Sequence, residues 1–501
     1  MVIERLKEWK GWQLAILSGV LLGLSFPPLK LGFLAWFGFL PLLRALLRER
    51  LIRGALLSFF AGLVTNGLAL HWLIFNIGAP LHITTASLVA ASLYLSIFWG
   101  LFGFVFLWLH SRIGAGLVLM PCLWVGLEFL MSLGPVGFPW VSLATTQTDY
   151  LPVIQLAEWT GIFGISFWLV SLNSILYDLF IVPRSHRLFL LREVSLVLAS
   201  IWLIGYVRLA TLSNDDQSKR VTVSVVQPNI GPHEKWRPEN RDEVFAQLDS
   251  LYLIAADSQP ALIIWPEAAT PAFLTKNQRR LAQVRNRIRQ TGIPLLTGTV
   301  DWGLSDRKRH YYNSVALIHE EGEIPIYHKN QLVPLGEFNP FVRQLPASED
   351  LNLGHYARGK KMTIFELGET SFASIICFES VFPRLVRRLT LEGAEFLVVV
   401  VNDGWYGKTA EPYQHEAIVR LRAVEHRYPV VRSANTGISA IIDKSGREVA
   451  TIGLEEAGVI TASIIPAKGE TLYNRLGDWI VFLAFLSLMH IGVRHWRAAN
   501  S

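Results

Sequence analysis

The stretch Ser374–Ser380 reads SIICFES, and it joins a buried-strand pattern to residues that can do chemistry. Ile375 and Ile376 belong to an apolar, β-branched run, which is typical of a strand covered on both faces. Cys377 follows at once, and Glu379 lies two residues further on. A sheet fixes the backbone at a strand end while the side chains there stay accessible. The stretch therefore predicts a buried sheet, and it leaves two interpretations of the cysteine, a core thiol or a nucleophile.

Similar runs recur on both sides of this stretch, with helical patterns between them. The helical patterns cover Glu239–Ala256, Lys276–Gln290 and Glu411–His426. The strand-like runs are VTVSVVQ, ALIIWPE, PLLTGTV, SVALIH, FLVVVVND, VVRSANTGISAIID and VITASII. This alternation predicts a layered α/β domain, which we place at residues 219–470.

The remainder of the chain is far more apolar. Hydrophobic residues make up 51% of the 501 residues and charged ones only 17%, which argues against an ordinary soluble protein. About 20 apolar residues span a membrane. Seven segments before Ser213 come close, and an eighth lies near the end of the chain. These predicted spans are Trp12–Phe26, Leu31–Leu47, Gly54–Phe75, Thr84–His110, Ala115–Leu133, Glu158–Phe180, Leu188–Leu209 and Trp479–Val493.

These patterns predict three parts. A transmembrane domain of seven helices covers residues 1–212, and a last transmembrane helix with a tail covers 476–501. The α/β domain lies between them, after a polar linker that reads SNDDQSKR. The apolar N-terminus resembles a signal peptide, but further apolar segments follow it at once, so we expect it to be retained as the first span.

The basic residues near the predicted spans are unevenly distributed. The loops NIGAPLHI and SLGPVGFPWVSLATTQTDYLP contain no Lys or Arg. With eight spans, the basic residues all lie on the opposite side, which the positive-inside rule makes cytoplasmic. Both termini are then cytoplasmic and the α/β domain is periplasmic. The basic residues are Arg5, Lys7, Lys10, Arg44, Arg48, Arg50, Arg53, Arg112, Arg184, Arg187, Arg192, Arg494 and Arg497.

The chain has only two cysteines. Cys122 lies inside an apolar segment, so a disulfide with Cys377 is not expected. A lone buried cysteine is more often a small hydrophobic residue than a nucleophile. A free thiol in an oxidising compartment shifts the balance towards a function.

Three strand-like runs end in reactive side chains. ALIIWPE ends at Glu267, YHKNQLVPLGEF carries Lys329 and Glu337, and SIICFES carries Cys377. The ordered set Glu, Lys, Cys resembles the nitrilase superfamily, whose domain is an α-β-β-α sandwich. The sequence motifs most specific to this resemblance are IIWPE, KNQLVPLGEF, ICFES, NDGWYG and SANTGISA. Together with the membrane spans, the layout resembles the apolipoprotein N-acyltransferase family of the bacterial inner membrane.

The resemblance implies residue roles. Cys377 is the nucleophile, Glu267 the general base, and Lys329 the residue that stabilises the tetrahedral intermediate. Family members often carry Tyr after the cysteine, where this chain has Phe378, so a hydroxyl role at that position is in doubt. The supporting residues of the active site are Glu337, Glu379, Trp236, Phe378, Asn402 and Trp405.

The resemblance also implies a reaction. A phospholipid donates an acyl chain, which passes through a cysteine thioester to the N-terminal amine of a diacylated apolipoprotein, in the last step of lipoprotein maturation. We expect a monomer without cofactor or nucleic-acid partner. A metal is not expected either, because His415 has no second histidine at ligand spacing. The alternatives are a membrane-anchored amidase that uses water, and a transporter or receptor whose outer domain only binds a ligand.

Two surface features have both a purely structural and a functional interpretation. The basic segment TKNQRRLAQVRNRIRQTG is either a solvated helix face or a lipid head-group site. The loops that carry Phe341 and Trp405 are either packed or act as lids over a lipid substrate.

Overall fold

The computed structural model describes residues 9–114, 116–181, 187–212, 220–305, 308–338 and 356–500. The chain forms two compact units. The first comprises Met1–Ser213, Thr409–Ala417 and Arg475–Ser501, and the second comprises Asn214–Lys408 and Ile418–Asn474. Several residues used in the predictions lie outside the described residues, namely Arg5, Lys7, Arg184, most of the SNDDQSKR linker and Phe341.

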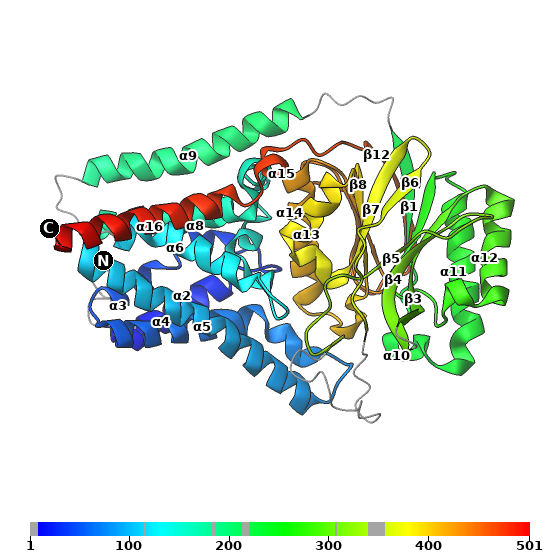
Figure 1. The fold of residues 1–501 in the computed structure, drawn as a ribbon, viewed down its shortest axis with the longest axis horizontal. Coiled ribbons are helices and arrows are strands. Elements are labelled where there is room, and N and C mark those ends of the chain that lie inside the picture. Colours follow the sequence, from blue (N-terminus) through cyan, green and yellow to red (C-terminus); the bar gives the residue numbers. More distant parts are fainter. Residues whose placement is uncertain are drawn as a thin grey trace. The chain divides into compact units, whose positions relative to one another are not determined.

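The first unit is helical (Figure 1). Within the described residues, four helices are long and apolar enough to cross a membrane: α4, α5, residues Ala157–Leu179 of α8, and α9. The other predicted spans correspond to shorter apolar helical segments, so the number eight stays a prediction. The α-helices are α2 (Gly11–Gly23), α3 (Leu40–Leu46), α4 (Leu51–Ala69), α5 (Leu81–Ile113), α6 (Gly116–Met131), α7 (Leu151–Ile154), α8 (Ala157–Ile181), α9 (Arg187–Thr211) and α16 (Trp479–Asn500).

Two predicted spans are interrupted. The segment Leu31–Leu47 is not one helix but a 3-10 turn, Gly32–Trp36, followed by α3. In the third predicted span α4 ends at Ala69, and a 3-10 turn, His71–Phe75, follows. Hydropathy averages over such breaks, because apolar residues occupy helices and turns alike once both are buried.

Small residues let the helices approach closely. A side chain at Gly19 of α2 would come within 2.7 Å of the Ala61 carbonyl oxygen on α4. At Gly23, one turn further, it would come within 2.7 Å of Leu68. Glycine at this spacing favours close packing of membrane helices, where there is little hydrophobic force between helices.

Gln414 lies on the first half of α14 (Glu411–His426). Its contacts explain why the short segment Thr409–Ala417 belongs to the helical unit. Its side-chain oxygen accepts hydrogen bonds from the indole nitrogens of Trp72 and Trp140, at 3.0 and 2.8 Å. Its amide donates to the carbonyl oxygens of Ala69 and Pro27. A buried amide with all these partners fixes the segment rigidly.

The second unit contains two six-stranded sheets with a similar plan (Figure 1). Each has a parallel centre, β1-β2-β3 or β7-β8-β9, and antiparallel strands towards its edges. The first sheet, in spatial order, is β12 (Gly458–Ile464), β1 (Val221–Gln227), β2 (Leu262–Trp265), β3 (Leu295–Ser305), β4 (Lys308–Ile318) and β5 (Ile326–His328). The second is β11 (Glu448–Ile452), β10 (Ser439–Ile442), β9 (Val430–Ala434), β8 (Phe396–Val401), β7 (Thr370–Ile376) and β6 (Ile364–Leu367).

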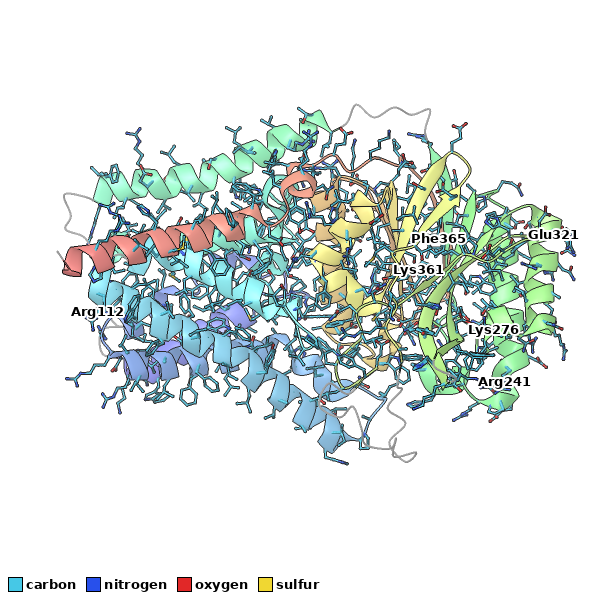
Figure 2. The ribbon with its side chains drawn as sticks, viewed as in Figure 1. Arg112, Arg241, Lys276, Glu321, Lys361 and Phe365 are labelled. Atoms are coloured by element: carbon cyan, nitrogen blue, oxygen red, sulfur yellow. The ribbon has the colours of Figure 1, made fainter. Side chains whose placement is uncertain are left out.

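The sheets pack face to face and helices cover their outer faces. Between the sheets, Phe372 stacks on Phe365 and Phe396 with ring centroids 5.2 and 4.8 Å apart (Figure 2 labels Phe365). Helices α11 (Arg241–Ala256) and α12 (Gln278–Thr291) cover the first sheet, and α13 (Pro383–Leu391) and α14 cover the second. The predicted α-β-β-α layering of this domain is confirmed. Apolar residues on both faces of the strands stabilise it, at roughly 25 cal/mol for each Å² buried.

The basic helix α12 uses most of its arginines within the domain. Arg280 pairs with Asp242, and Arg287 forms a two-pronged salt bridge with Asp249, both on α11. Arg289 lies near Glu321, and Lys276 near Asp301, each at 3.5 Å (Figure 2 labels Lys276 and Glu321). These pairs favour the interpretation of a solvated helix face over that of a lipid site.

Candidate active site

The turn after β2 places Glu267, which is 8% exposed. The neighbouring strand β3 carries Gly298, where a side chain would lie 2.5 Å from the Glu267 Cα atom. Gly298 donates its N–H to the Pro266 carbonyl oxygen, and its own carbonyl oxygen accepts from the Ala269 N–H. The turn can therefore lie directly on the strand only because position 298 has no side chain.

Lys329 follows β5 and is 1% exposed. Its Nζ lies 2.8 Å from Glu337 Oε1 and 3.9 Å from Glu267 Oε1. Burial favours the neutral amine, but the charges of Glu337, Glu267 and Cys377 outweigh it and raise the pKa of Lys329 above its ordinary value. The site therefore contains a permanently charged ammonium between two carboxylates.

Asn313, on β4, is a member of this cluster that the sequence analysis missed. Its side-chain nitrogen donates to Glu267 Oε1 at 2.7 Å and to Glu337 Oε1 at 3.1 Å. Its backbone oxygen accepts from the Lys329 N–H. The available signal is a polar amide directly before the apolar run SVALIH, since a buried polar group on a strand usually has a hydrogen-bond partner.

Cys377 begins the 3-10 turn Cys377–Val381, directly after β7. It is partly exposed, whereas Cys122 is buried, and, as expected, neither cysteine forms a disulfide. Its φ of 49° is left-handed, a conformation that costs a residue other than glycine about 1–3 kcal/mol. The Glu379 carboxylate accepts from the backbone N–H groups of Ile376 and Asn330, which brings the residue before Cys377 close to the residue after Lys329.

Glu379 holds the strained turn in place. Its side chain is completely buried. One oxygen accepts from the Tyr327 hydroxyl and from the backbone N–H groups of Asn330 and Gln331, at 2.6–3.0 Å, and the other accepts from the Ile376 N–H. The carboxylate thus joins the segment next to Lys329, in one sheet, to the strand end of the other sheet. Burial raises the pKa of Glu379 to about 7. The hydrogen bonds favour the ionised carboxylate and so lower this pKa, but burial outweighs them.

The environment of Glu267 suits a base that must take up and return a proton. Burial raises its pKa, the charge of Lys329 lowers it, and the charge of Glu337 raises it again, with a net upward shift. Tyr356 also faces the carboxylates, and burial raises its pKa to about 12, so its hydroxyl stays neutral. A carboxyl with a raised pKa is a stronger base and is better matched to a thiol.

The predicted aromatic and amide residues lie in nearby loops. Trp236, 42% exposed, follows α10 (Pro232–Lys235), and Trp405 contacts His233 of that helix edge to face at 6.0 Å. Asn402 follows β8 and accepts a hydrogen bond from Asn435.

The Phe378 ring does not share the exposure of Trp236. It is 3% exposed and packs edge to face against Phe382, with ring centroids 5.1 Å apart. Its immediate role in the structure is therefore packing of the turn that carries the cysteine.

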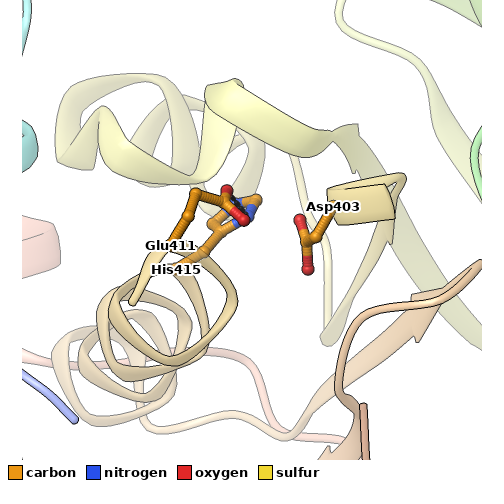
Figure 3. A group of neighbouring side chains, drawn as sticks. All are labelled: Asp403, Glu411 and His415. Atoms are coloured by element: carbon orange, nitrogen blue, oxygen red, sulfur yellow. Dashed lines mark ion pairs between the residues drawn. The ribbon is translucent and has the colours of Figure 1, made fainter. Parts of the chain in front are cut away.

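Figure 3 draws three residues with groups that bind metals in other proteins. His415 Nδ1 lies 3.5 Å from Glu411 Oε1, one turn earlier on α14. The Asp403 carboxylate forms a buried salt bridge with Arg432 at 2.6 Å. The salt bridge to Arg432 accounts for the position of Asp403, and the expectation that no metal takes part stays a prediction.

Comparison with known proteins agrees with this geometry. Residues 222–472 match the carbon-nitrogen hydrolase family, and residues 18–175 match the apolipoprotein N-acyltransferase N-terminal domain. The apolipoprotein N-acyltransferase of Geobacter metallireducens is 31% identical over 94% of this chain and 92% of its own length. The enzyme of that name from Chlorobaculum tepidum is 31% identical over 94% of both chains.

The chain belongs to the apolipoprotein N-acyltransferase family. The family assignment applies to both units, because relatives of this family align along nearly the whole chain. The carbon-nitrogen hydrolase match covers the two sheets, and therefore the cluster of Glu267, Lys329 and Glu337 and the strand end that carries Cys377.

Proposed function

We propose that this member of the apolipoprotein N-acyltransferase family transfers an acyl chain from a phospholipid to the N-terminal amine of a diacylglyceryl-modified apolipoprotein. One observation carries the proposal. A cluster of Glu267, Lys329 and Glu337 adjoins a cysteine at a strand end that forms no disulfide, and the described part of the chain also has four helices able to cross a membrane.

In the first step Cys377 attacks the ester carbonyl carbon of the phospholipid. The thiol proton moves to Glu267, the C–S bond forms, and the ester C–O bond breaks. Glu267 returns the proton to the departing alkoxide, which leaves as lysophospholipid. A free thiol is mostly protonated at neutral pH, so a positioned base is needed, at a typical gain of about 10²–10⁴ in rate.

In the second step the amine of the apolipoprotein attacks the thioester. The C–N bond forms and the C–S bond breaks. Glu267 takes the proton that the amine loses and returns it to the sulfur. A thioester is reactive enough to form an amide without ATP.

Lys329 stabilises the oxyanion in both steps. Its ammonium is fixed by Glu337 and keeps its charge across the working pH range. Loss of one fixed donor to an oxyanion typically costs about 3–4 kcal/mol of transition-state stabilisation.

The membrane unit keeps the reaction close to lipid. Transfer of a chain of about 15 methylenes into water costs on the order of 12 kcal/mol, at about 0.8 kcal/mol each. We propose eight spans within residues 1–212 and 476–501, a periplasmic catalytic domain at residues 219–470, cytoplasmic termini, and activity as a monomer in the bacterial inner membrane.

Labelled phospholipid tests the proposal. Wild-type protein should acquire a labelled acyl group that hydroxylamine removes, and Cys377→Ala should not, whereas the control Cys122→Ala should label normally. A diacylated lipopeptide should then discharge the label as an amide. Release of free fatty acid in its place would identify the membrane-anchored amidase. Persistence of the label in Cys377→Ala would contradict the thioester.

A further inference from the structure

A hydrogen bond between β4 and β5 lies directly beside the candidate site, and the reaction above leaves it unused. Asn313 and Lys329 contact the carboxylates of the site. Their neighbours along the chain, Ser314 and His328, are paired across the two strands, and Ser314 Oγ lies 2.8 Å from His328 Nδ1. Successive side chains on a strand point to opposite faces, so this bond lies on the face away from the carboxylates.

Strand β5 depends on such a contact because it is a short edge strand. It pairs with β4 through three residue pairs, and Ser314–His328 is the last of them before Lys329. The next backbone bond runs from the Lys329 N–H to the Asn313 carbonyl oxygen, at 2.9 Å. A slip of one residue would turn every side chain of β5 to the opposite face. The side-chain bond therefore supports the register in which Lys329 reaches Glu337.

Tyr312 and Asp301 hold the imidazole ring of His328 in place. The ring stacks on Tyr312 with centroids 4.3 Å apart, and Nε2 lies 4.0 Å from Asp301 Oδ2. Asp301 is 3% exposed and itself accepts a hydrogen bond from Thr275. Burial lowers the pKa of His328, the charge of Asp301 raises it, and that of Lys276 lowers it, with a net downward shift. The ring is therefore neutral at neutral pH and can bond to a hydroxyl.

Serine, histidine and aspartate also form hydrolase triads, but this geometry does not fit one. In a triad the serine contacts Nε2 of the histidine and the aspartate contacts Nδ1. Here Ser314 contacts Nδ1, and Asp301 lies on the Nε2 side. Ser314 is also completely buried, so a substrate carbonyl cannot reach its hydroxyl.

We propose that His328 is a positioning residue for the active site. Its hydrogen bond to Ser314 locks the end of β5 against β4, and so keeps the Lys329 ammonium and the Asn313 amide together on the carboxylates. The consequence for turnover rests on the function proposed above. The lock itself does not, because it belongs to the fold of the free protein.

Hydrogen exchange measures the lock without any substrate. The full-length chain in detergent is exposed to heavy water, and mass spectrometry follows the peptide that contains Lys329. His328→Phe keeps a ring against Tyr312 but removes both nitrogens, and Ser314→Ala removes the partner oxygen. Each variant should speed exchange of the Lys329 N–H roughly fivefold, which is the usual effect of one hydrogen bond.

Two further variants are controls for this experiment. In His328→Asn the side-chain amide can occupy the place of Nδ1, so the bond to Ser314 and slow exchange should be kept. His310→Phe makes the same change of residue type elsewhere on β4, where His310 pairs with Gly303, and should alter nothing.

Thioester formation with labelled phospholipid measures the effect on catalysis. In His328→Phe the rate at saturating lipid should fall roughly 10- to 100-fold, because a displaced Lys329 stabilises the oxyanion less well. The lipid concentration at half saturation should not change. His328→Asn should recover most of the rate. The double variant Ser314→Ala, His328→Phe should be no slower than the slower single variant, because both changes remove the same bond.

Thermal unfolding of each variant checks the fold, and Ser314→Ala replaces His328→Phe if the latter does not fold. Unchanged exchange, fast exchange with a normal acylation rate, or a loss in His328→Asn equal to that in His328→Phe would overturn the proposal. So would effects of the two single changes that multiply in the double variant. Failure of phospholipid to label the wild type would reject the acyltransfer function, and the exchange experiment would still decide whether the lock exists.

Discussion

At the scale of single residues, the three glutamates of the candidate site, of which Glu267 and Glu379 are buried and Glu337 is partly buried, make different contacts. Glu337 pairs with Lys329, Glu267 accepts a hydrogen bond from Asn313, and Glu379 binds mainly backbone N–H groups. The backbone of Cys377 is in a strained left-handed conformation. Such strain persists only where surrounding contacts hold the backbone in place, and the hydrogen bonds of Glu379 supply such contacts.

Replacement of Glu379 tests this anchoring role. Glu379→Gln has one acceptor oxygen and adds a donor among N–H groups, so it leaves buried donors unsatisfied, at about 1–3 kcal/mol each. We expect a lower melting temperature in detergent and slower alkylation of Cys377. Glu369→Gln, on an exposed turn, is the matched control. A normal melting temperature with full reactivity would contradict the role.

The raised pKa of Glu267 predicts the acid limb of the wild-type reaction. As the pH falls through this pKa the carboxyl is protonated and cannot accept the thiol proton, so acylation slows. The midpoint should lie above the ordinary glutamate value of about 4.3. Single-turnover thioester formation between pH 4.5 and 9 measures it. A rate that stays flat down to pH 4.5 would exclude Glu267 as the base.

At the scale of elements, the site is built from the ends of parallel strands in two different sheets. Strand β2 of the first sheet leads to Glu267, and β7 of the second leads to Cys377. The face-to-face core fixes the two sheets, and the contacts of Glu379 join them next to the site. Rigid strands therefore set the distance between Glu267 and Cys377 more precisely than loops can.

The close approach of β3 to the Glu267 turn gives a prediction for this element. In Gly298→Ala the added methyl meets backbone at 2.5 Å, so the turn must shift and carry Glu267 with it. We expect thioester formation to fall by about 10²-fold, the usual cost of roughly 1 Å of misplacement. Gly303→Ala on the same strand meets only a Tyr312 ring carbon at 3.7 Å and should be nearly normal. Equal rates in both variants would show that this packing is unimportant.

At the scale of the whole molecule, the proposed orientation is open to a direct test. Cysteines placed at Lys468 and at Arg112 (labelled in Figure 2) report on the catalytic unit and on the end of α5. In a Cys122→Ala, Cys377→Ala background an impermeant maleimide should label Lys468→Cys in intact spheroplasts. Arg112→Cys should be labelled only after the membrane is permeabilised. The reverse pattern would refute a periplasmic catalytic domain.

Periodicity and composition determined much of this protein on their own. The helix predicted at Glu411–His426 coincides with α14, and those predicted near residues 239 and 276 begin two residues early. The layering of the α/β domain was also predictable, because burial on both faces leaves continuous apolar runs. Glu267, Lys329 and Cys377 could also be predicted as candidate site residues, because they lie at the ends of such apolar runs.

Only the tertiary structure decided how these residues meet. Asn313 bridges two carboxylates, and Glu379 joins two sheets. Local sequence carries none of this, because each relation joins segments that are far apart in the chain. Sequence periodicity reports which face of an element is buried. Pairing, burial of charge and pKa depend on which neighbours the fold brings to that face.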